Sequence, residues 1–284
     1  MSISLSKINI KGRYPFVRLK QFIVNPISFY NWLLKNTYFR FTRNDYSSKY
    51  DHFTFLTPNE SLDYLIKNEA SLARFNDGEF DQLLGYGIYP PNSDWSQDNS
   101  KGLSRDIATV LSSSDHRLLV ATTPSWYFLS ADGSEFEEDF CKGMWRHTKA
   151  ILYKYLNHEQ SYGDCRLFVP TSSPDLDWPK LKSYLSKKNV IIATGDVKNI
   201  SHIKLGKKNY YIECGKTNAY EIRKDILSSI RECLFENELS KDSTIVLASL
   251  GPTAGIIAYD LLGEVVVWDT GHIFRYAQEK INVL

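Results

Sequence analysis

Residues 244–255 read TIVLASLGPTAG, and this stretch decides the fold of the chain. Its first half is a run of apolar and β-branched side chains, which favours a buried strand over residues 244–250. A Gly-Pro pair follows, and proline suits the first position of a helix, so we expect a helix over residues 252–262. A continuously apolar strand that leads directly into a helix is typical of a parallel sheet covered on both faces.

The rest of the chain repeats this alternation of strand and helix. Short apolar runs predict further strands at residues 117–122, 165–169, 190–194, 210–213 and 265–269. Helical patterns between them predict helices at residues 135–156, 176–187 and 219–236. A short strand is also expected at residues 72–73, with helical residues at 80–84. The sequence therefore predicts a three-layer α/β fold with its ligands at the carboxyl ends of the strands.

Length and composition exclude several classes of protein. The 284 residues are 43% hydrophobic, which is enough to bury a sizeable core and argues against a disordered chain. The net charge of +1 gives no cationic field over the whole protein, so nucleic acid is not an expected partner. The four cysteines lie far apart, which disfavours a zinc site or a disulfide framework. Because no run of eighteen apolar residues and no signal-peptide layout is present, we expect a soluble, cytoplasmic protein.

The neutral total hides a basic segment at residues 1–50. It holds nine basic side chains and one acidic side chain, a net charge of +8, which leaves −7 for the remainder. Aromatic residues are interleaved with the basic ones, and this composition is typical of a segment that binds an anionic membrane surface. The alternative is that the segment folds back and completes the hydrophobic core. We expect a boundary between this basic, aromatic-rich arm, residues 1–56, and a single domain over residues 57–284.

The first candidate site is RFNDGEF, residues 74–80, directly after a predicted strand. Asp77 and Glu79 lie two residues apart in a turn at Gly78, where both carboxylates can face one point. Carboxylate oxygens suit a hard divalent cation that can in turn hold a diphosphate, and Arg74 can bind a phosphate as well. The alternative is a solvated turn, because Asp and Gly favour turn geometry, and the tripeptide alone favours this second interpretation.

Two further candidates follow predicted strands at the same edge of the sheet. At Gly251, Pro252 and Thr253 the exposed amides of a helix start can bind an anion, although the lysine of a Walker loop is absent. Asp269 and His272 can act in acid–base catalysis or bind ribose and phosphate. The alternatives are an ordinary βα turn for the first group and a helix cap with a solvated histidine for the second.

Four segments of the chain, taken in order, resemble the motifs of the GT-D glycosyltransferase family. They are RFNDGEF at 74–80, CGKTNAY at 214–220, LGPTA at 250–254 and DTGH at 269–272. Order and spacing agree from about residue 59 to residue 277, so the resemblance covers most of the chain but not the basic arm. It implies a Rossmann-like glycosyltransferase fold, with a mostly parallel sheet and helices on both faces.

The resemblance also implies a donor, a metal and a set of site residues. The donor is a nucleotide sugar, typically UDP-linked, and the family's D-x-E motif, which serves Mn²⁺ or Mg²⁺, falls on Asp77 and Glu79. The other motif positions fall on Arg74, Asn218, Gly251, Pro252, Thr253, Asp269 and His272. We therefore expect a metal-dependent enzyme that moves a hexose from a UDP-sugar to a glycan or lipid-linked saccharide in bacterial surface-glycan synthesis. Asp269 and His272 are the candidate bases.

The chain departs from the family pattern at three places. Asn76 replaces the glycine before Asp-Gly-Glu, and Cys165 precedes Arg166 where a Ser-Arg pair is usual. The Gly- and Asn-rich loop expected around Asp196 and Lys198 is not recognisable, which leaves their roles open. Two other functions also stay open: another nucleotide-binding α/β enzyme, and a non-catalytic membrane-surface subunit of a polysaccharide assembly complex.

Overall fold

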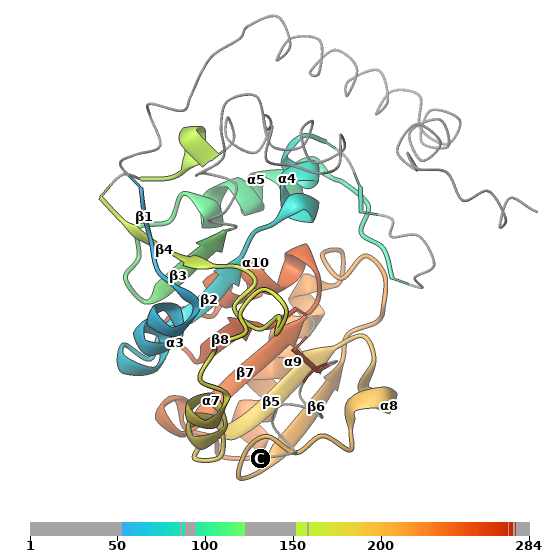
Figure 1. Ribbon diagram of the computed structural model, residues 1–284. Coiled ribbons are helices and arrows are strands. Elements are labelled where there is room, and N and C mark those ends of the chain that lie inside the picture. Colours follow the sequence, from blue (N-terminus) through green and yellow to red (C-terminus); the bar gives the residue numbers. More distant parts are fainter. Residues whose placement is uncertain are drawn as a thin grey trace, which may run out of the picture.

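The computed structural model describes residues 53–85, 87–88, 95–122, 152–157, 159–271, 273–274 and 276, and only the backbone of Asp77. The described residues form an eight-stranded sheet in the order β1-β4-β3-β2-β8-β7-β5-β6 (Figure 1). The strands are β1 (Thr54–Phe55), β2 (Ser71–Arg74), β3 (Leu118–Thr122), β4 (Ser161–Asp164), β5 (Asn189–Thr194), β6 (Asn209–Glu213), β7 (Thr244–Ser249) and β8 (Val266–Asp269). All neighbouring strands pair in parallel, which confirms the predicted α/β fold.

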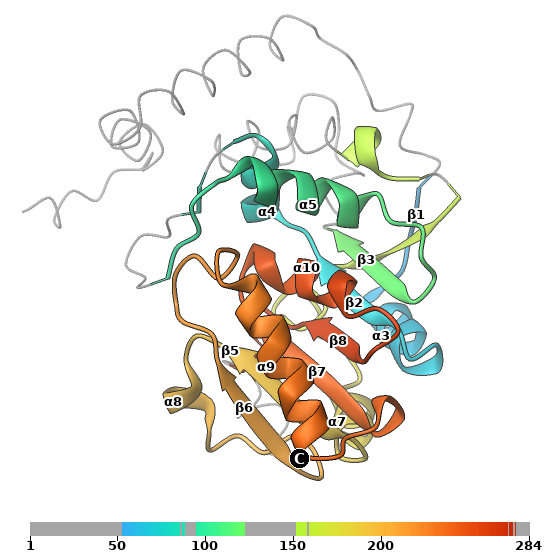
Figure 2. The same cartoon turned by 180° about the vertical axis from the view of Figure 1, so that it is seen from behind.

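Helices cover both faces of the sheet, as predicted. On the face seen in Figure 1 lie α3 (Pro58–Lys67) and α7 (Trp178–Leu185). Figure 2 shows the opposite face, covered by α5 (Lys101–Leu111), α9 (Arg223–Glu236) and α10 (Pro252–Asp260). Two shorter helices, α4 (Asp77–Leu83) and α8 (Val197–Ile200), follow the carboxyl ends of β2 and β5.

Strand β7 shows how one apolar run serves both layers. Ile245 and Leu247 belong to the hydrophobic cluster that includes α3 and α7, whereas Val246 and Ala248 belong to the cluster that includes α5, α9 and α10. All four side chains are fully buried. Because successive side chains of a strand face opposite sides, a strand covered on both faces must be apolar at every position.

Six of the predicted strands match β2, β3, β5, β6, β7 and β8 to within one residue at each end. The prediction of a strand at residues 165–169 is wrong. The strand there is β4, which ends at Asp164, and a turn follows it. The Asp164 carboxylate accepts a hydrogen bond from the Arg166 amide at 2.8 Å, a local bond that competes with ladder pairing. Leu167 and Phe168 are apolar because they pack in the core.

The sequence patterns missed β1, α3, α5 and α8, and they placed the start of α9 four residues too early. Thr54 and Phe55, near the end of the predicted arm, pair with β4 in the sheet. Residues 1–50 and most of the helix predicted at 135–156 lie outside the described residues. Among the helices that the structure describes, none is long and apolar enough to cross a membrane.

Candidate active site

Strands β2 and β8 lie next to each other at the centre of the site. The segments that follow their carboxyl ends leave toward opposite faces of the sheet. The two strands are neighbours, with Leu72 opposite Trp268. Strand β2 leads into α4, whose Phe80 packs in the cluster of α5 and α10, whereas Ile273 and Phe274 after β8 pack in the cluster of α3 and α7. Ligands of open α/β sheets bind in the crevice that forms at such a switch point, beyond the carboxyl ends of the strands.

A buried ion pair between Arg74 and Asp269 lies at this switch point. Nη2 of Arg74 lies 3.0 Å from Oδ1 of Asp269, and Nε donates to the same oxygen at 3.3 Å and to the Asp269 carbonyl oxygen at 2.8 Å. Nη1 donates to the carbonyl oxygen of Cys165, just after β4, at 2.7 Å. The guanidinium is therefore fixed by groups at the ends of β8 and β4 as well as by its own strand.

Burial and the attraction between opposite charges shift the pKa values of Arg74 and Asp269 in opposite directions. Burial raises the pKa of Asp269, and the Arg74 guanidinium opposes that shift. Burial alone would lower the pKa of Arg74, but attraction to Asp269 and smaller contributions from Cys165, the Asp269 hydrogen bond and Glu79 together outweigh burial, so the pKa is raised. Arg74 is thus a permanent cation, and its side chain is still 17% exposed. A guanidinium has five N–H groups, so these three nitrogens keep two N–H groups available for an anion.

Gly271 lies two residues after the end of β8, at a position that favours glycine. Its φ of 49° lies in the left-handed region, and its amide donates to Oδ1 of Asp269 at 3.1 Å. A Cβ on this residue would lie 2.0 Å from Nη2 of Arg74, well inside contact distance. The glycine is therefore required both by the backbone conformation and by the guanidinium packed against it.

The Asp-Gly-Glu segment forms the first turn of α4. Asn76 precedes the helix with an extended backbone at φ −131°, so a side chain is tolerated where the family has glycine. The Asn76 amide donates to Oε2 of Glu79 at 2.8 Å, which stabilises the helix start. A Cβ on Gly78 would lie 2.9 Å from Cδ1 of Ile88, so the end of that side chain would have to shift. Glu79 therefore caps a helix in addition to any ligand that it binds.

The predicted metal ligands are only partly described, because the side chain of Asp77 lies outside the described residues. Within the described residues, no three or more Asp, Glu, His or Cys side chains gather into a metal cage. Mg²⁺ in phosphate-handling enzymes is usually held by one or two carboxylates, with substrate phosphates and water completing its shell. Glu79 is half-buried at the site edge and fits such a shared site in its chemistry. Mn²⁺ or Mg²⁺ stays a prediction.

The start of α10 lies at the same edge, directly after β7. Gly251 has a φ of 56°, and Pro252 follows at the first helical turn. Thr253 is fully buried, and its hydroxyl has no hydrogen-bond partner among the described residues. The ring of Trp95 lies 3.8 Å from the position that a Cβ of Gly251 would take. The helix start thus combines a buried hydroxyl that has no partner among the described residues with a flanking aromatic ring.

Asn218 is tied to a neighbouring segment at the rim of the site. Its Oδ1 accepts from the Asp98 amide at 2.8 Å, and its Nδ2 donates to the Asp98 carboxylate at 3.0 Å. Its φ of 50° is one that asparagine adopts more readily than most residues. Tyr220 and Arg223 continue the network by donating to the Asp106 carboxylate of α5. The Asn-Ala-Tyr motif therefore fastens the loop after β6, and a role of Asn218 in donor binding stays a prediction.

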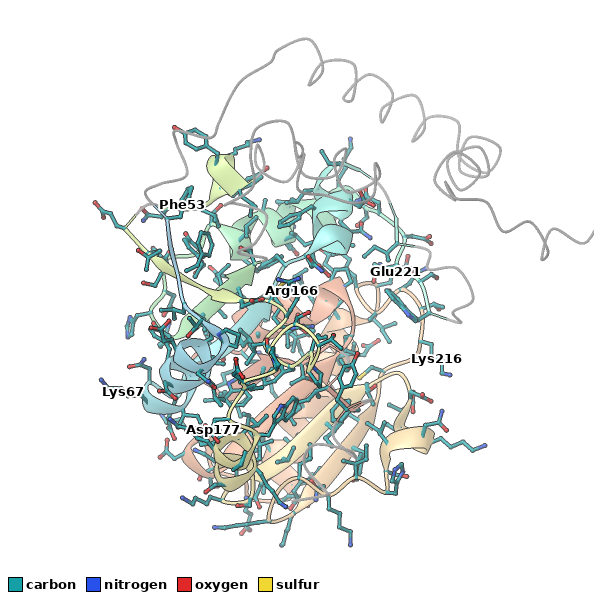
Figure 3. All side chains as sticks on the ribbon, viewed as in Figure 1. Phe53, Lys67, Arg166, Asp177, Lys216 and Glu221 are labelled. Carbon is teal, nitrogen blue, oxygen red and sulfur yellow. The ribbon has the colours of Figure 1, made fainter. Side chains whose placement is uncertain are left out.

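Two groups at this edge escaped the sequence patterns, Asp164 and Trp95. Asp164 is buried at the end of β4; burial raises its pKa, and Arg166 opposes the shift. Arg166, whose Nε lies 3.8 Å from Oδ1 of Asp164, appears near the middle of the molecule in Figure 3. The strand predicted at residues 165–169 put Asp164 before a strand instead of at the end of one, so the sequence patterns carried no signal for it. Trp95 has no signal either, because its neighbour Gly251 is far away in the sequence.

The structure thus distributes the predicted site residues unevenly. It brings Arg74, Asp269 and Glu79 together, with the start of α10 packed on β2 through Gly255, whose Cβ position is 3.3 Å from the Ala73 side chain. It places Asn218 at the rim. His272 lies outside the described residues, as does the Asp77 side chain.

Two curated proteins that are similar to this chain are named as glycosyltransferases. The chain is 27% identical over 240 residues to the "Probable glycosyl transferase Gly" of Streptococcus gordonii, and 25% identical over 232 residues to the "Glycosyltransferase GlyD" of Streptococcus pneumoniae serotype 4. These matches cover 77% and 75% of this chain but only 32% and 26% of the relatives. The chain therefore spans a third or less of the length of these curated relatives.

A solved structure and a family model extend the comparison. The structure, described as a new glycosyltransferase (DUF1792) from Streptococcus sanguinis, is 28% identical with a TM-score of 0.60, and the match covers 81% of this chain and 85% of that one. The family model described as "Glycosyltransferase GT-D fold" matches residues 72–279, from β2 past the last described residue. The chain belongs to the glycosyltransferase GT-D fold family.

Proposed function

We propose that this chain is a metal-dependent glycosyltransferase that moves a hexose from a nucleotide sugar, with UDP as the nucleotide, to a glycan or lipid-linked saccharide. The observation that carries the proposal is the Arg74 guanidinium, fixed by Asp269 at the carboxyl edge of the sheet beside Glu79. The start of α10 lies at the same edge. A permanent cation, a carboxylate and helix-start amides together suit a nucleoside diphosphate.

The leaving group decides what these residues must do. In a glycosyl transfer the bond between the anomeric carbon and the diphosphate oxygen breaks, and negative charge develops on the diphosphate. The two remaining N–H groups of Arg74 would donate to the diphosphate oxygens. The backbone N–H groups of Gly251 and Thr253 would add hydrogen bonds at the positive end of the helix dipole, whereas Pro252 has no N–H to donate. A Mn²⁺ or Mg²⁺ ion held by Asp77 and Glu79 would supply further neutralisation of the diphosphate.

The acceptor hydroxyl must also lose a proton when it attacks the sugar. Asp269 and His272 are the predicted bases. Oδ1 of Asp269 already accepts from Arg74 and from the Gly271 amide, so its contacts support a positioning role for Asp269. In this proposal Asp269 holds the guanidinium in place, and His272 takes the proton.

The proposal places the enzyme in the cytoplasm, peripherally at the inner face of the membrane. Its support is the composition of residues 1–50, which carry a net charge of +8 interleaved with aromatic side chains. Deletion of residues 1–50 should release the protein from anionic vesicles and spare hydrolysis of a soluble donor. A truncated protein that melts far below the full chain would instead support the alternative that the arm completes the core.

A donor screen tests the activity. The purified chain is incubated with a panel of nucleotide sugars, with and without Mn²⁺, and release of the nucleoside diphosphate is followed. We expect turnover of UDP-hexoses that a chelator abolishes. Turnover in the presence of chelator would contradict the metal dependence. Arg74 and the start of α10 would then have to stabilise the charge of the diphosphate without a metal ion.

Variants of the two carboxylates locate the activity in the site. Asp77→Asn and Glu79→Gln should each lower turnover by at least 100-fold, whereas Glu232→Gln, on the exposed face of α9, should leave it unchanged. Each variant is melted beside the wild type, because Glu79 also caps α4. If the folded wild-type protein binds UDP but hydrolyses no donor, the result favours the alternative of a non-catalytic subunit of a polysaccharide assembly complex. Turnover of another nucleotide substrate would favour a different enzyme.

A further inference from the structure

The segment from α7 to the loop after β6 carries an unusual charge. Residues 178–216 hold nine lysines, no arginine and only two acids, Asp196 and Glu213, a net charge of +7. The whole chain has a net charge of only +1. Residues 1–50 carry +8 and this segment +7, so the rest of the chain has a net charge of −14 and the net excess of positive charge lies in these two parts.

Three of the nine lysines are accounted for by contacts within the fold. Lys188 is buried, and its Nζ contacts Oε1 of Glu69 at 2.7 Å and the carbonyl oxygen of Asp242. Lys180 pairs with Asp63, and Lys216 lies 3.6 Å from Asp196. These three have structural partners and carry no inference.

Of the other six, Lys182 is half-buried on α7 and is not considered further. The remaining five are exposed, and none of the five forms an ion pair among the described residues. We call them the β6-edge basic surface: Lys187, Lys198, Lys204, Lys207 and Lys208. A surface lysine usually has little to gain from a single partner. Five exposed lysines within residues 187–208, none in an ion pair among the described residues, form a local excess of positive charge.

Hydrogen bonds place the segments that carry Lys187, Lys204 and Lys207 next to β5 and β6, at one edge of the sheet. The Lys207 amide donates to the Lys188 carbonyl oxygen at 2.8 Å, which places Lys207 beside Lys187. The Tyr211 hydroxyl of β6 donates to the carbonyl oxygens of Ser201 and Ile203, so the connection carrying Lys204 packs on that strand. Strand β6 is the last strand of the sheet, and Figures 1 and 2 show α8 beside it.

Protection of an exposed strand does not explain these charges. Edge strands often carry a lysine that prevents pairing with another chain. Strand β6 itself, with the sequence NYYIE, contains no lysine. The lysines flank the strand, where they cannot block its pairing groups directly.

The type of side chain identifies the kind of partner. Arginine is the usual choice for a discrete phosphate or a base edge, because its planar fork binds two oxygens at once. Lysine is a compact, hydrated charge on a flexible stem, which suits a diffuse negative surface such as anionic phospholipid headgroups. We propose that the β6-edge basic surface binds the protein to an anionic phospholipid membrane, in addition to any contact made by residues 1–50.

Vesicle binding by the full chain tests this surface. The probe is phosphatidylcholine vesicles with and without phosphatidylglycerol. The variant Lys187→Gln/Lys204→Gln/Lys207→Gln/Lys208→Gln removes four charges from the surface. At about 1 kcal/mol per lysine near an anionic leaflet, its partition coefficient should fall by at least 100-fold at low salt. Wild-type binding should itself weaken steeply with added salt.

A matched variant separates the local surface from total charge. It replaces four exposed lysines on other elements, Lys67, Lys101, Lys224 and Lys241, with glutamine. This control should bind within threefold of wild type, and thermal melts confirm that both variants fold. The proposal is overturned if the two variants lose affinity equally, if the first binds like wild type, or if wild type ignores anionic vesicles. Binding of duplex DNA by the same lysines, without vesicle binding, would identify a nucleic acid as the partner instead.

Discussion

Replacement of Gly271 by alanine should damage both stability and the site. The added Cβ would lie 2.0 Å from Nη2 of Arg74, so either the backbone after β8 or the guanidinium must move. An L-residue in the left-handed region costs about 1–2 kcal/mol. Overpacking adds about 1–3 kcal/mol, and a broken buried ion pair costs about 3–5 kcal/mol.

Gly215 supplies the control for the backbone contribution. Its φ is 69°, and no described atom lies within 4 Å of its Cβ position, so Gly215→Ala carries the conformational cost without the collision. Gly271→Ala should therefore lose at least about 2 kcal/mol more than Gly215→Ala. That difference corresponds to a melting temperature lower by roughly 4–8 °C in a domain of this size.

A double-mutant cycle assigns the excess to the guanidinium. Lysine at position 74 lacks the Nη2 atom, so Arg74→Lys in the Gly271→Ala background should recover part of the lost stability, with a coupling energy above about 1 kcal/mol. Equal melting temperatures for Gly271→Ala and Gly215→Ala would refute the reasoning. Strict additivity in the cycle would refute it as well.

Three other perturbations have outcomes that follow from the structure. Thr253→Val should raise the melting temperature slightly, because it removes a buried hydroxyl without a partner, and should weaken donor binding measured by calorimetry; unchanged binding would take that hydroxyl out of the site. Trp95→Ala should raise the KM for the donor several-fold with little change in stability, which steady-state kinetics and a melt can separate. The pKa of Asp115 is lowered to about 2 by hydrogen bonds from Arg117, so its contribution to stability is present above pH 4 and disappears as the pH falls toward 2. Asp115→Asn should cost at most about 1 kcal/mol at pH 7 and nothing near pH 2 in denaturant titrations, and an equal cost at both pH values would contradict this assignment.

The sheet was predictable wherever burial on both faces forces a continuous apolar run. This holds for β5 and β7, in which the four central positions of each strand are buried and pack alternately in the two layers. It fails at β4, whose sequence SYGD is polar, and at β1, which has two residues. Helix α3 had a readable signal in Thr57 and Glu60, whose reciprocal hydrogen bonds form a capping box.

The site was predictable as a set of positions but not as a set of contacts. Strand ends place Arg74 and Asp269 at the same edge of a parallel sheet, which the sequence implies. No local pattern indicates that the two side chains bind each other, since 195 positions separate them. In the same way, the two hydrogen bonds between Asn218 and Asp98 depend on a loop that no periodicity in the sequence predicts.

The separation of Arg74 from Asp269 also has a consequence for biosynthesis. Strand β2 leaves the ribosome early, whereas β8, which inserts between β2 and β7, is the last strand that the structure describes. Until β8 emerges, no strand joins β2 to β7, and the Arg74 guanidinium lacks the Asp269 carboxylate. Nascent chains that stop before β8 should therefore expose open strand edges to chaperones and should fail to retain a nucleotide ligand. Ligand capture on arrested ribosomes would thus report the moment at which the sheet closes.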